Sequence, residues 1–278
     1  MRWRLALASL SRVGTVVLAA FLILAGGCAT APDSGDAAAV AEYHKTNDPG
    51  EPTNRAIFEV NRGLDSALLK PVATIYRDLT PRFFQDRVND VLDNLGSPVI
   101  FANDILQGEV DRAITTVVRL MINSTIGLLG LFDFATEMGI EGHDEDFGQT
   151  LAAWGMPEGP YVMLPIFGPS NPRDTIGLIV DFLIDPLHIW ANNTDRDFVI
   201  FARGGTRGVD IRATNMEALD DLEKTSLDFY ATIRSLYRQR RAEEIRNGTL
   251  PADMPAPGLS QSPAGPRLSG QEQALRIH

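Results

Sequence analysis

The sequence predicts a mainly α-helical protein, and three observations point that way. Apolar residues recur at helical spacing, the stretches that carry them are bounded by Asn, Ser, Pro and Gly, and the alternating Val and Thr runs typical of strands are missing. With 278 residues, 44% hydrophobic and 22% charged, the chain can bury a core and is not a multispanning membrane protein. A net charge of -11 argues against a nucleic-acid partner.

The first 27 residues have the form of a signal peptide. Three arginines and no acidic residue precede an apolar run over 13–24, which is shorter than the roughly 20 residues needed to cross a bilayer. The run ends in small residues just before Cys28. We therefore predict a lipoprotein signal peptide over 1–27, with cleavage before Cys28.

Cys28 is the only cysteine in the chain and cannot form an internal disulfide. Its position resembles the bacterial lipobox, in which the thiol receives a diacylglycerol and the new amino terminus a third acyl chain. Three acyl chains would anchor the protein durably. Ala29 is not the Asp that retains envelope lipoproteins at the inner membrane, so outer-membrane delivery is expected. The alternative is a secreted soluble protein with a free thiol.

Composition divides the mature chain into three parts. Residues 28–47 have too few large apolar side chains to offset the entropy of ordering, which predicts a flexible lipidated tether. Residues 248–278 contain five prolines among Gly, Ser and Ala, which predicts a disordered Pro-rich tail. The single folded domain is expected over 48–247.

The first helices of that domain are predicted from an apolar stripe and its boundaries. The stripe over 88–95 predicts a helix that ends near Gly96. Ser97 and Pro98 then have the form of an N-cap followed by proline at the first helical position, which predicts a second helix that Gly108 ends.

The later elements follow the same rules. Asn171 and Pro172 predict another helix start before the apolar stretch 176–184. One long helix with a single apolar face is predicted over 215–247. The uncharged segment 159–169 between these parts has little scope for regular structure.

The stretch 109–132 is unusual because its apolar residues surround the helix axis instead of forming a stripe. Its charge-free part, 120–132, is too short to span a bilayer, and so is 176–184. Such stretches either form the core of a helical domain or lie in one leaflet and line a lipid passage.

Arg119 stands at the start of the charge-free part, and an arginine in an apolar segment needs a partner. The sequence offers Asp133 or Asp181 for a structural ion pair. The alternative partner is a lipid phosphate, which a guanidinium can bind with two parallel hydrogen bonds.

A series of short motifs runs through residues 48 to 190 in one order and register. They are Asp48-Pro49 with Glu51 and Asn54-Arg55, Lys70-Pro71-Val72-Ala73, Tyr76-Arg77-Asp78, Asn94-Leu95, Pro98, Asn103, Leu106-Gln107-Gly108, Arg119, Asn123-Ser124-Thr125-Ile126-Gly127, Gly130, Phe132-Asp133, Phe147-Gly148-Gln149-Thr150-Leu151, Gly155, Gly159-Pro160-Tyr161, Leu164-Pro165, Gly168-Pro169-Ser170, Arg173-Asp174, Gly177 and Asp181. This series resembles the MlaA (also called VacJ) family of phospholipid-binding outer-membrane lipoproteins. Beyond about residue 190 the match is looser.

The resemblance implies a helical ring in the inner leaflet of the outer membrane, with an amphipathic channel and trimeric porins as neighbours. Mislocalised phospholipid would pass from the outer leaflet to a periplasmic carrier that feeds an inner-membrane ABC transporter, which maintains lipid asymmetry. No cofactor is implied. The candidates for lining the channel are Leu120, Met121, Ile126, Gly127, Leu128, Leu129, Gly130, Leu131 and Phe132. Gly127 and Gly130 would allow a close backbone approach or simply end the helix.

Two other function classes stay open, an envelope phospholipase and a structural porin-associated lipoprotein. For an enzyme, the stretch around Ser170 starts like G-x-S-x-G, but flanking prolines oppose the required strand–turn–helix elbow. His143 and His188 are read as surface or packing residues. The acidic cluster over 141–146 breaks the calcium-loop pattern and is read as a solvated loop. No catalytic or metal-binding residue is therefore nominated.

Overall fold

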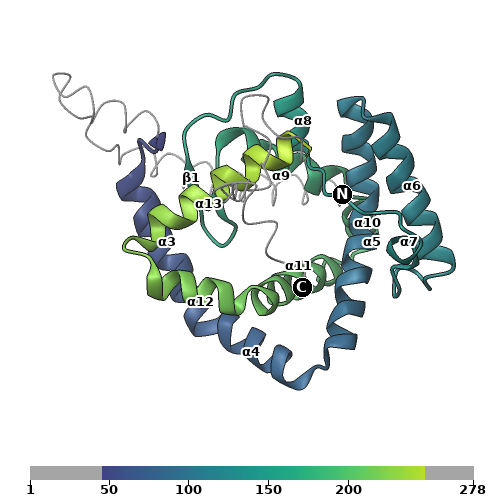
Figure 1. The fold of residues 1–278 in the computed structure, drawn as a ribbon, viewed down its shortest axis with the longest axis horizontal. Coiled ribbons are helices and arrows are strands. Elements are labelled where there is room, and N and C mark those ends of the chain that lie inside the picture. The colour runs from purple at the N-terminus through teal and green to yellow at the C-terminus, as the bar shows by residue number, and fades with distance from the viewer. Residues whose placement is uncertain (1–45, 248–278) are drawn as a thin grey trace, which may run out of the picture.

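The computed structural model of the chain describes residues 46–247, and over this range it is mainly helical (Figure 1). The predicted fold class is therefore confirmed. The predicted signal peptide, Cys28 with its tether, and the Pro-rich tail lie outside the described residues. The described elements are α3 (Glu51–Leu64), η1 (Asp65–Leu69), α4 (Lys70–Leu79), α5 (Arg82–Gln107), α6 (Val110–Thr125), α7 (Phe134–Glu137), α8 (Phe147–Ala153), β1 (Val162–Leu164), β2 (Gly168–Ser170), α9 (Pro172–Ile184), α10 (Pro186–Asn193), α11 (Phe198–Thr214), α12 (Met216–Thr225) and α13 (Phe229–Ile245).

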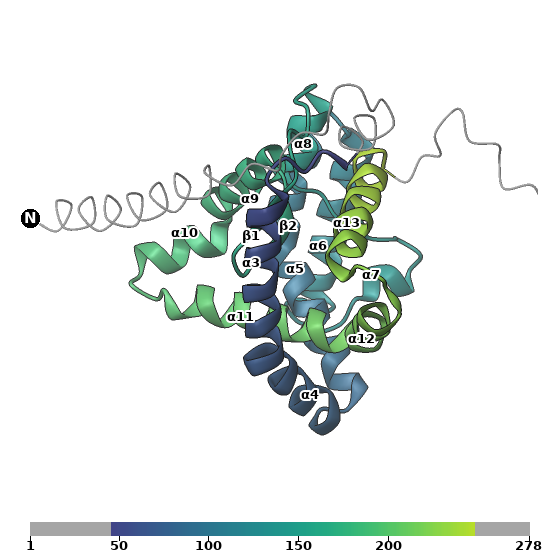
Figure 2. The same ribbon diagram turned by 90° about the vertical axis from the view of Figure 1, so that its left-hand side faces the viewer.

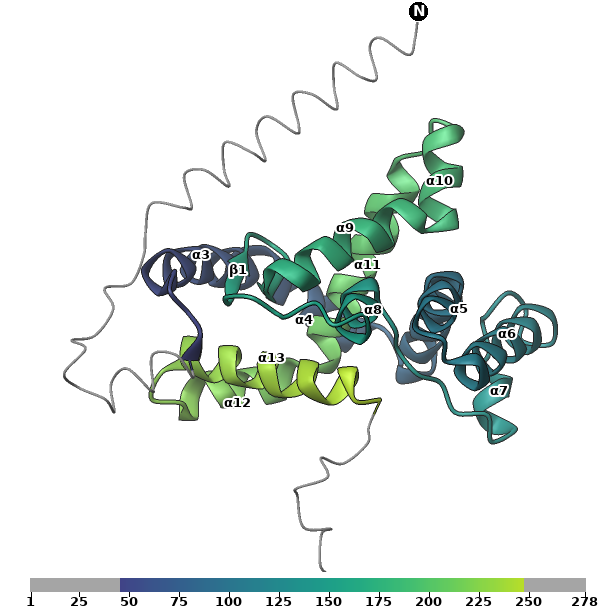
Figure 3. The ribbon, with the colours of Figure 1, turned by 90° about the horizontal axis from the view of Figure 1, so that it is seen from above.

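The helices follow one another around a closed path instead of packing as a bundle (Figure 1). α3, η1 and α4 form one continuous rod down one side, as Figure 2 shows, and α5 returns on the other side with α6 packed against it. Seen from above, α10 projects on one side of this frame, and α12 and α13 lie on the opposite side (Figure 3).

Helix α5 corrects one sequence prediction. The two helices expected to meet at Ser97 and Pro98 are one helix over Arg82–Gln107, with Pro98 inside it. The Ser97 hydroxyl donates backwards to the carbonyl of Asp93 (3.2 Å) and does not cap the following turn. Serine at this place therefore supports the preceding turn, and the chain continues through the proline.

The start of α9 confirms the prediction at Asn171 and Pro172. Pro172 opens the helix, and the Asn171 side chain accepts a hydrogen bond from the Asp174 amide at 2.8 Å. The long helix expected over 215–247 is wrong, because the chain breaks into α12 and α13 at residues 226–228. There the Asp228 side chain caps α13 by accepting from the Ala231 amide.

The segment 159–169 holds a short antiparallel hairpin of β1 and β2, where no regular structure was expected. Two asparagines of α3 hold the first strand and the turn. Asn54 Nδ2 donates to the Tyr161 carbonyl (3.0 Å) and its Oδ1 accepts from the Met163 amide (2.9 Å). Asn61 bonds in the same way with Leu164 and Ile166. Side chains of a helix therefore supply hydrogen bonds that a third strand would otherwise make.

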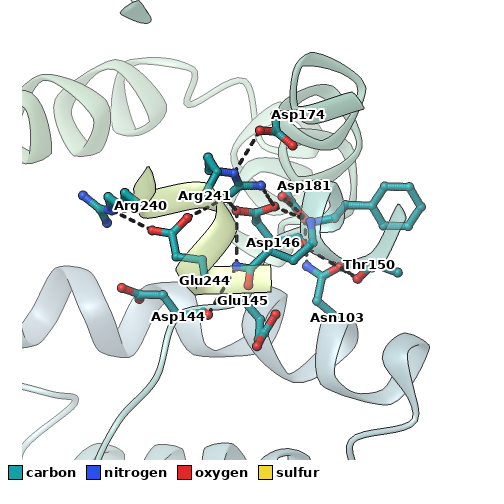
Figure 4. A network of polar contacts seen from close by, with 12 residues as sticks. Asn103, Asp144, Glu145, Asp146, Thr150, Asp174, Asp181, Arg240, Arg241 and Glu244 are labelled. Atoms are coloured by element: carbon teal, nitrogen blue, oxygen red, sulfur yellow. Dashed lines mark hydrogen bonds and ion pairs between the residues drawn. The ribbon is translucent and has the colours of Figure 1, made fainter. Parts of the chain in front are cut away.

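The acidic segment before α8 is only in part the solvated loop that its composition suggested, because Glu141 and Asp144 are exposed but Glu145 and Asp146 are not. Glu145 is buried and lies 2.5 Å from Arg112 of α6. Asp146 caps α8 and pairs with Arg241 of α13 at 2.6 Å, while Arg241 also reaches Asp174 of α9 at 2.9 Å (Figure 4). These carboxylates are structural, because they join α6, α8, α9 and α13.

Candidate functional site

The described domain buries polar side chains and exposes apolar ones. Fifteen of its buried residues are polar or charged and eleven are apolar, whereas thirty-three large apolar residues are exposed. The three largest polar side chains with almost no exposure are Asn103, Asp104 and Thr150. Asn103 of α5 accepts a hydrogen bond from Thr150 of α8, and Asp104 of α5 accepts one from Thr116 of α6. A protein surrounded by water shows the opposite tendency. The exposed surface of this domain is therefore suited to an apolar environment.

The most exposed part of the predicted apolar segment is the loop after α6, over 126–131. Helix α6 ends at Thr125, so the apolar residues that follow do not surround a helix axis as expected. Leu128 and Leu129 are 64% and 75% exposed and hold positive φ angles of 54° and 62°. The left-handed region costs a leucine roughly 1–2 kcal/mol. The two leucines are therefore exposed at a cost in backbone strain.

Two glycines allow this loop to fold back on itself. A Cβ on Gly127 would lie 2.2 Å from the Phe132 carbonyl oxygen, and one on Gly130, which has φ +90°, would lie 2.4 Å from Cβ of Asn94. Both glycines thus permit close approach at the point where the helix ends, which unites the two roles considered from the sequence. The loop is packed directly on α5.

The nine residues nominated for the channel divide by exposure. Exposed are Met121, Ile126, Leu128, Leu129 and Leu131; Leu120 and Phe132 are half-buried; Gly127 and Gly130 are buried. Phe132 stacks on Phe134, with ring centroids 5.8 Å apart. The exposed members lie on the surface of the loop and of the end of α6, and the others support them.

Arg119 pairs with Asp133, one of the two acidic partners that the sequence offered. Its Nη2 lies 2.9 Å from Asp133 Oδ2, and it also donates to Thr136 and to the Ile140 carbonyl. Burial by itself would raise the pKa of Asp133, but hydrogen bonds from Thr136, Asn123 and Arg119 outweigh it and lower the pKa to about 2. The other expected partner, Asp181, instead accepts from Asn103 and from the Phe147 amide.

A polar cavity of about 340 Å³ lies beside this loop, between α5, α6, α11 and the segment before α8. Three arginines and three aspartates line it together with neutral polar residues and two apolar ones. The lining residues are Asp90, Leu92, Asp93, Asn94, Gly96, Ser97, Ile100, Thr116, Arg119, Asn123, Gly142, His143, Asp144, Arg203 and Arg207.

The wall of this cavity holds desolvated charge. Burial raises the pKa of Asp90 and of Asp93 above the ordinary value, while Arg87 and Arg207, respectively, act in the opposite direction. Asn94 joins the cavity to the loop over 126–131, the leucine loop, because its Nδ2 donates to Ser124 (3.1 Å) and its Cβ faces Gly130. Its Oδ1 is buried and has no hydrogen-bond partner within residues 46–247.

The residues weighed for catalysis have structural partners. The Ser170 hydroxyl is buried and lies 2.9 Å from the Thr175 hydroxyl. His143 Nε2 lies 3.0 Å from the buried carboxylate of Asp104, and the His188 ring contacts Phe182 at 3.8 Å between centroids. Within the described range, no cluster of His, Cys, Asp and Glu could hold a metal ion.

No helix in residues 46–247 combines the length and the apolar character needed to cross a bilayer. A helical frame with apolar side chains outside, polar ones inside and a polar cavity beside exposed leucines defines a protein that contacts an apolar partner such as lipid. The model of the MlaA lipoprotein family matches residues 46–244, and the chain belongs to that family.

The chain is also similar to individual proteins. The chain is 38% identical over 197 residues to an uncharacterized protein of Rickettsia typhi, covering 70% of this chain and 77% of that protein. It is 30% identical over 229 residues to the intermembrane phospholipid transport system lipoprotein MlaA of Haemophilus influenzae, covering 81% and 87%. A solved structure concerned with the structural basis for maintenance of bacterial outer membrane lipid asymmetry matches with a TM-score of 0.64 and 30% identity, covering 71% of this chain and 98% of that chain.

The sequence interpretation missed the polar half of this site. Arg203 and Arg207 of α11 stand one helical turn apart, and so do Asn89 and Asp93 of α5. Arg207 Nη1 donates to both Asn89 (3.0 Å) and Asp93 (2.6 Å). Residues four apart lie on one face of a helix, but this spacing gives no sign of which other helix that face meets.

Proposed function

We propose that this chain removes mislocalised phospholipid from the outer leaflet of the outer membrane and passes it on for retrograde transport, which maintains lipid asymmetry. The single observation that carries the proposal is the pair of exposed, left-handed leucines, Leu128 and Leu129, beside a polar cavity. Its membership of the MlaA lipoprotein family supports the same function.

The physical task explains why both kinds of surface are needed. Two acyl chains hold about 30 methylenes, so their full exposure to water would cost on the order of 25 kcal/mol at about 0.8 kcal/mol each. A protein that moves such a molecule must cover the tails with apolar groups and receive the headgroup among polar ones. The leucine loop and the adjoining cavity supply these two surfaces, without covalent catalysis.

The location and partners belong to the same proposal. Cys28, once acylated, would anchor the chain on the periplasmic face of the outer membrane. Trimeric porins would be its neighbours there, and a periplasmic carrier feeding an inner-membrane ABC transporter would receive the lipid. A lipid anchor and an apolar outer surface together suit a domain immersed in one leaflet.

Cells provide a direct test of the leucine loop. Replacing Leu128 by Asp should raise detergent sensitivity and outer-leaflet phospholipid to the level of a strain that lacks the protein. Leu227→Asp is the matched control, because Leu227 is likewise an exposed leucine but lies between α12 and α13. Wild-type behaviour of Leu128→Asp would remove the assignment for this loop.

A phospholipase makes a different prediction. Purified protein would then release fatty acid from phospholipid, and Ser170→Ala or a histidine variant would abolish the release. We expect no release, because the buried Ser170 hydroxyl at the end of β2 is hydrogen-bonded to the Thr175 hydroxyl of α9.

A further inference from the structure

Arginine and aspartate side chains are equal in number in the lining of the cavity between α5, α6 and α11. This balance bears on which kind of lipid headgroup the cavity can accommodate. Its lining holds three arginines, Arg119, Arg203 and Arg207, against three aspartates, Asp90, Asp93 and Asp144. We propose that this cavity receives the headgroup of the transported phospholipid and favours one with an ammonium group beside its phosphate over an anionic one. This inference rests on the proposed function.

The cationic side of the cavity has donors to spare. A guanidinium carries five N–H donors. Arg203 pairs with Asp185 through Nη1, and Arg207 bonds to Asn89 and Asp93 through Nη1. The structure gives the remaining nitrogens of these two arginines no partner within residues 46–247. They can therefore donate to a phosphate oxygen, for which arginine is well shaped.

The anionic side has a free carboxylate. Asp144 is exposed, lines the cavity and has no hydrogen bond or ion pair at its carboxylate within residues 46–247. Asp93 lines the same cavity, and although burial is the main cause of its raised pKa, the charge of Asp144 adds to it. A primary ammonium group, with three donors, would satisfy Asp144 and relieve that repulsion.

The position of the tails follows from Asn94. This residue lines the cavity and also touches Gly130, which follows the exposed Leu128 and Leu129. A lipid with its headgroup in the cavity can thus lay its chains on the leucine loop. The volume of about 340 Å³ lies at the lower end of the range of small-ligand sites, about 300–1,000 Å³, which fits a headgroup alone.

The test measures which lipid the full chain holds. Protein isolated from membranes is incubated in detergent with equal amounts of dioleoyl phosphatidylethanolamine and dioleoyl phosphatidylglycerol, and bound lipid is read by native mass spectrometry. We expect about fivefold more phosphatidylethanolamine, which corresponds to about 1 kcal/mol. Asp144→Asn should bring the ratio to about one, because binding of phosphatidylethanolamine falls toward that of phosphatidylglycerol when its ammonium group loses this partner.

Glu141→Gln is the matched control, because Glu141 is exposed in the same segment but does not line the cavity. It should keep the wild-type ratio. Equal binding of both lipids by the wild type, or equal loss of preference in the two variants, would overturn the headgroup assignment and leave the proposed function standing. Absence of any bound phospholipid in the wild type would contradict the proposed function itself.

A third arm separates a lipid from a soluble phosphate ester. Phosphoethanolamine without acyl chains is added as competitor at the concentration of the lipid. We expect little displacement, because the chains contribute most of the binding free energy. Displacement as effective as that by the lipid would show that the cavity serves a soluble ligand and would overturn the proposal.

Discussion

Leu128 and Leu129 carry the clearest sign of function at the scale of single residues. Large apolar side chains that are exposed and also held in the left-handed region oppose both burial and backbone preference. Strain of this kind persists where the surroundings impose it and is concentrated at functional sites. The loop is therefore organised for contact with an apolar partner and not for its own stability.

Replacing Leu128 by Asn tests this separation of function from stability. Asn enters the left-handed region with less strain, so the free energy of unfolding in detergent should stay the same or rise by up to about 1 kcal/mol. Binding of phospholipid should fall in the same variant. A large loss of stability, measured by urea unfolding, would show that Leu128 is a packing residue.

Gly130 makes the opposite prediction. Gly130→Ala combines a positive φ with a Cβ 2.4 Å from Asn94, and we expect a loss of about 2–4 kcal/mol in the free energy of unfolding. Gly139 has φ +81° and open space around it, so Gly139→Ala should cost only about 1 kcal/mol. Equal losses in the two variants would contradict the close packing of the loop on α5.

The ionised Asp133 carboxylate makes the stability of the domain depend on pH. Its folded pKa of about 2 lies below the ordinary value, so its contribution is fully present above about pH 4 and is lost as the pH falls through 2. Asp133→Asn should cost about 1–3 kcal/mol at neutral pH, because Arg119 loses its charged partner. The difference between wild type and variant should shrink between pH 4 and pH 2, as followed by thermal unfolding. A constant difference would argue against the ion pair.

At the scale of elements, two side chains of α3 make the hydrogen bonds to the hairpin that a third strand would make in a larger sheet. The hairpin has only three residues in each strand, and Asn54 and Asn61 complete its hydrogen bonding. Isolated two-stranded hairpins are marginal in water. The hairpin therefore depends on α3 for its position.

Asn54→Ala should loosen the hairpin without unfolding the domain. The Met163 amide loses its acceptor, so we expect faster hydrogen exchange at Met163 and a cost of about 1–3 kcal/mol. Asn193→Ala, at the exposed end of α10, should leave exchange in the hairpin unchanged. Unchanged exchange at Met163 in Asn54→Ala would show that packing alone holds the strand.

The same elements show what sequence patterns can predict. The start of α9 could be predicted because its signal is local: the Asn171 side chain accepts a hydrogen bond from the Asp174 amide in the first turn of the helix. The hairpin does not, because its partner Asn54 lies 107 residues away from Tyr161. Ser97 and Pro98 misled the prediction for α5, because a serine can bond backwards as easily as forwards.

The candidate site divides in the same way. Its apolar half was visible as a charge-free run around Leu128, although nothing in the pattern signals a left-handed backbone. The ion pair of Arg119 with Asp133 was one of the alternatives considered. The polar half was missed, because Arg203 and Asp144 are far apart in the sequence and line the same cavity only after the helices have closed into their path.

At the scale of the whole molecule, polar residues inside and apolar residues outside form one pattern. Ion pairs such as Arg241 with Asp146 and Asp174 hold the helices together from within (Figure 4). The large apolar side chains lie at the exposed surface, where they can contact lipid instead of water. The chain thus gains stability from its interior polar network and affinity for lipid from its exterior.

The lipid content of the purified protein tests the central claim most directly. Native mass spectrometry of the full chain isolated from outer membranes should find bound phospholipid in the wild type and in Leu227→Asn. The double variant Leu128→Asn with Leu129→Asn should lose most of that lipid while remaining folded. A wild-type protein that carries no phospholipid, or a double variant that carries as much as the wild type, would contradict the account.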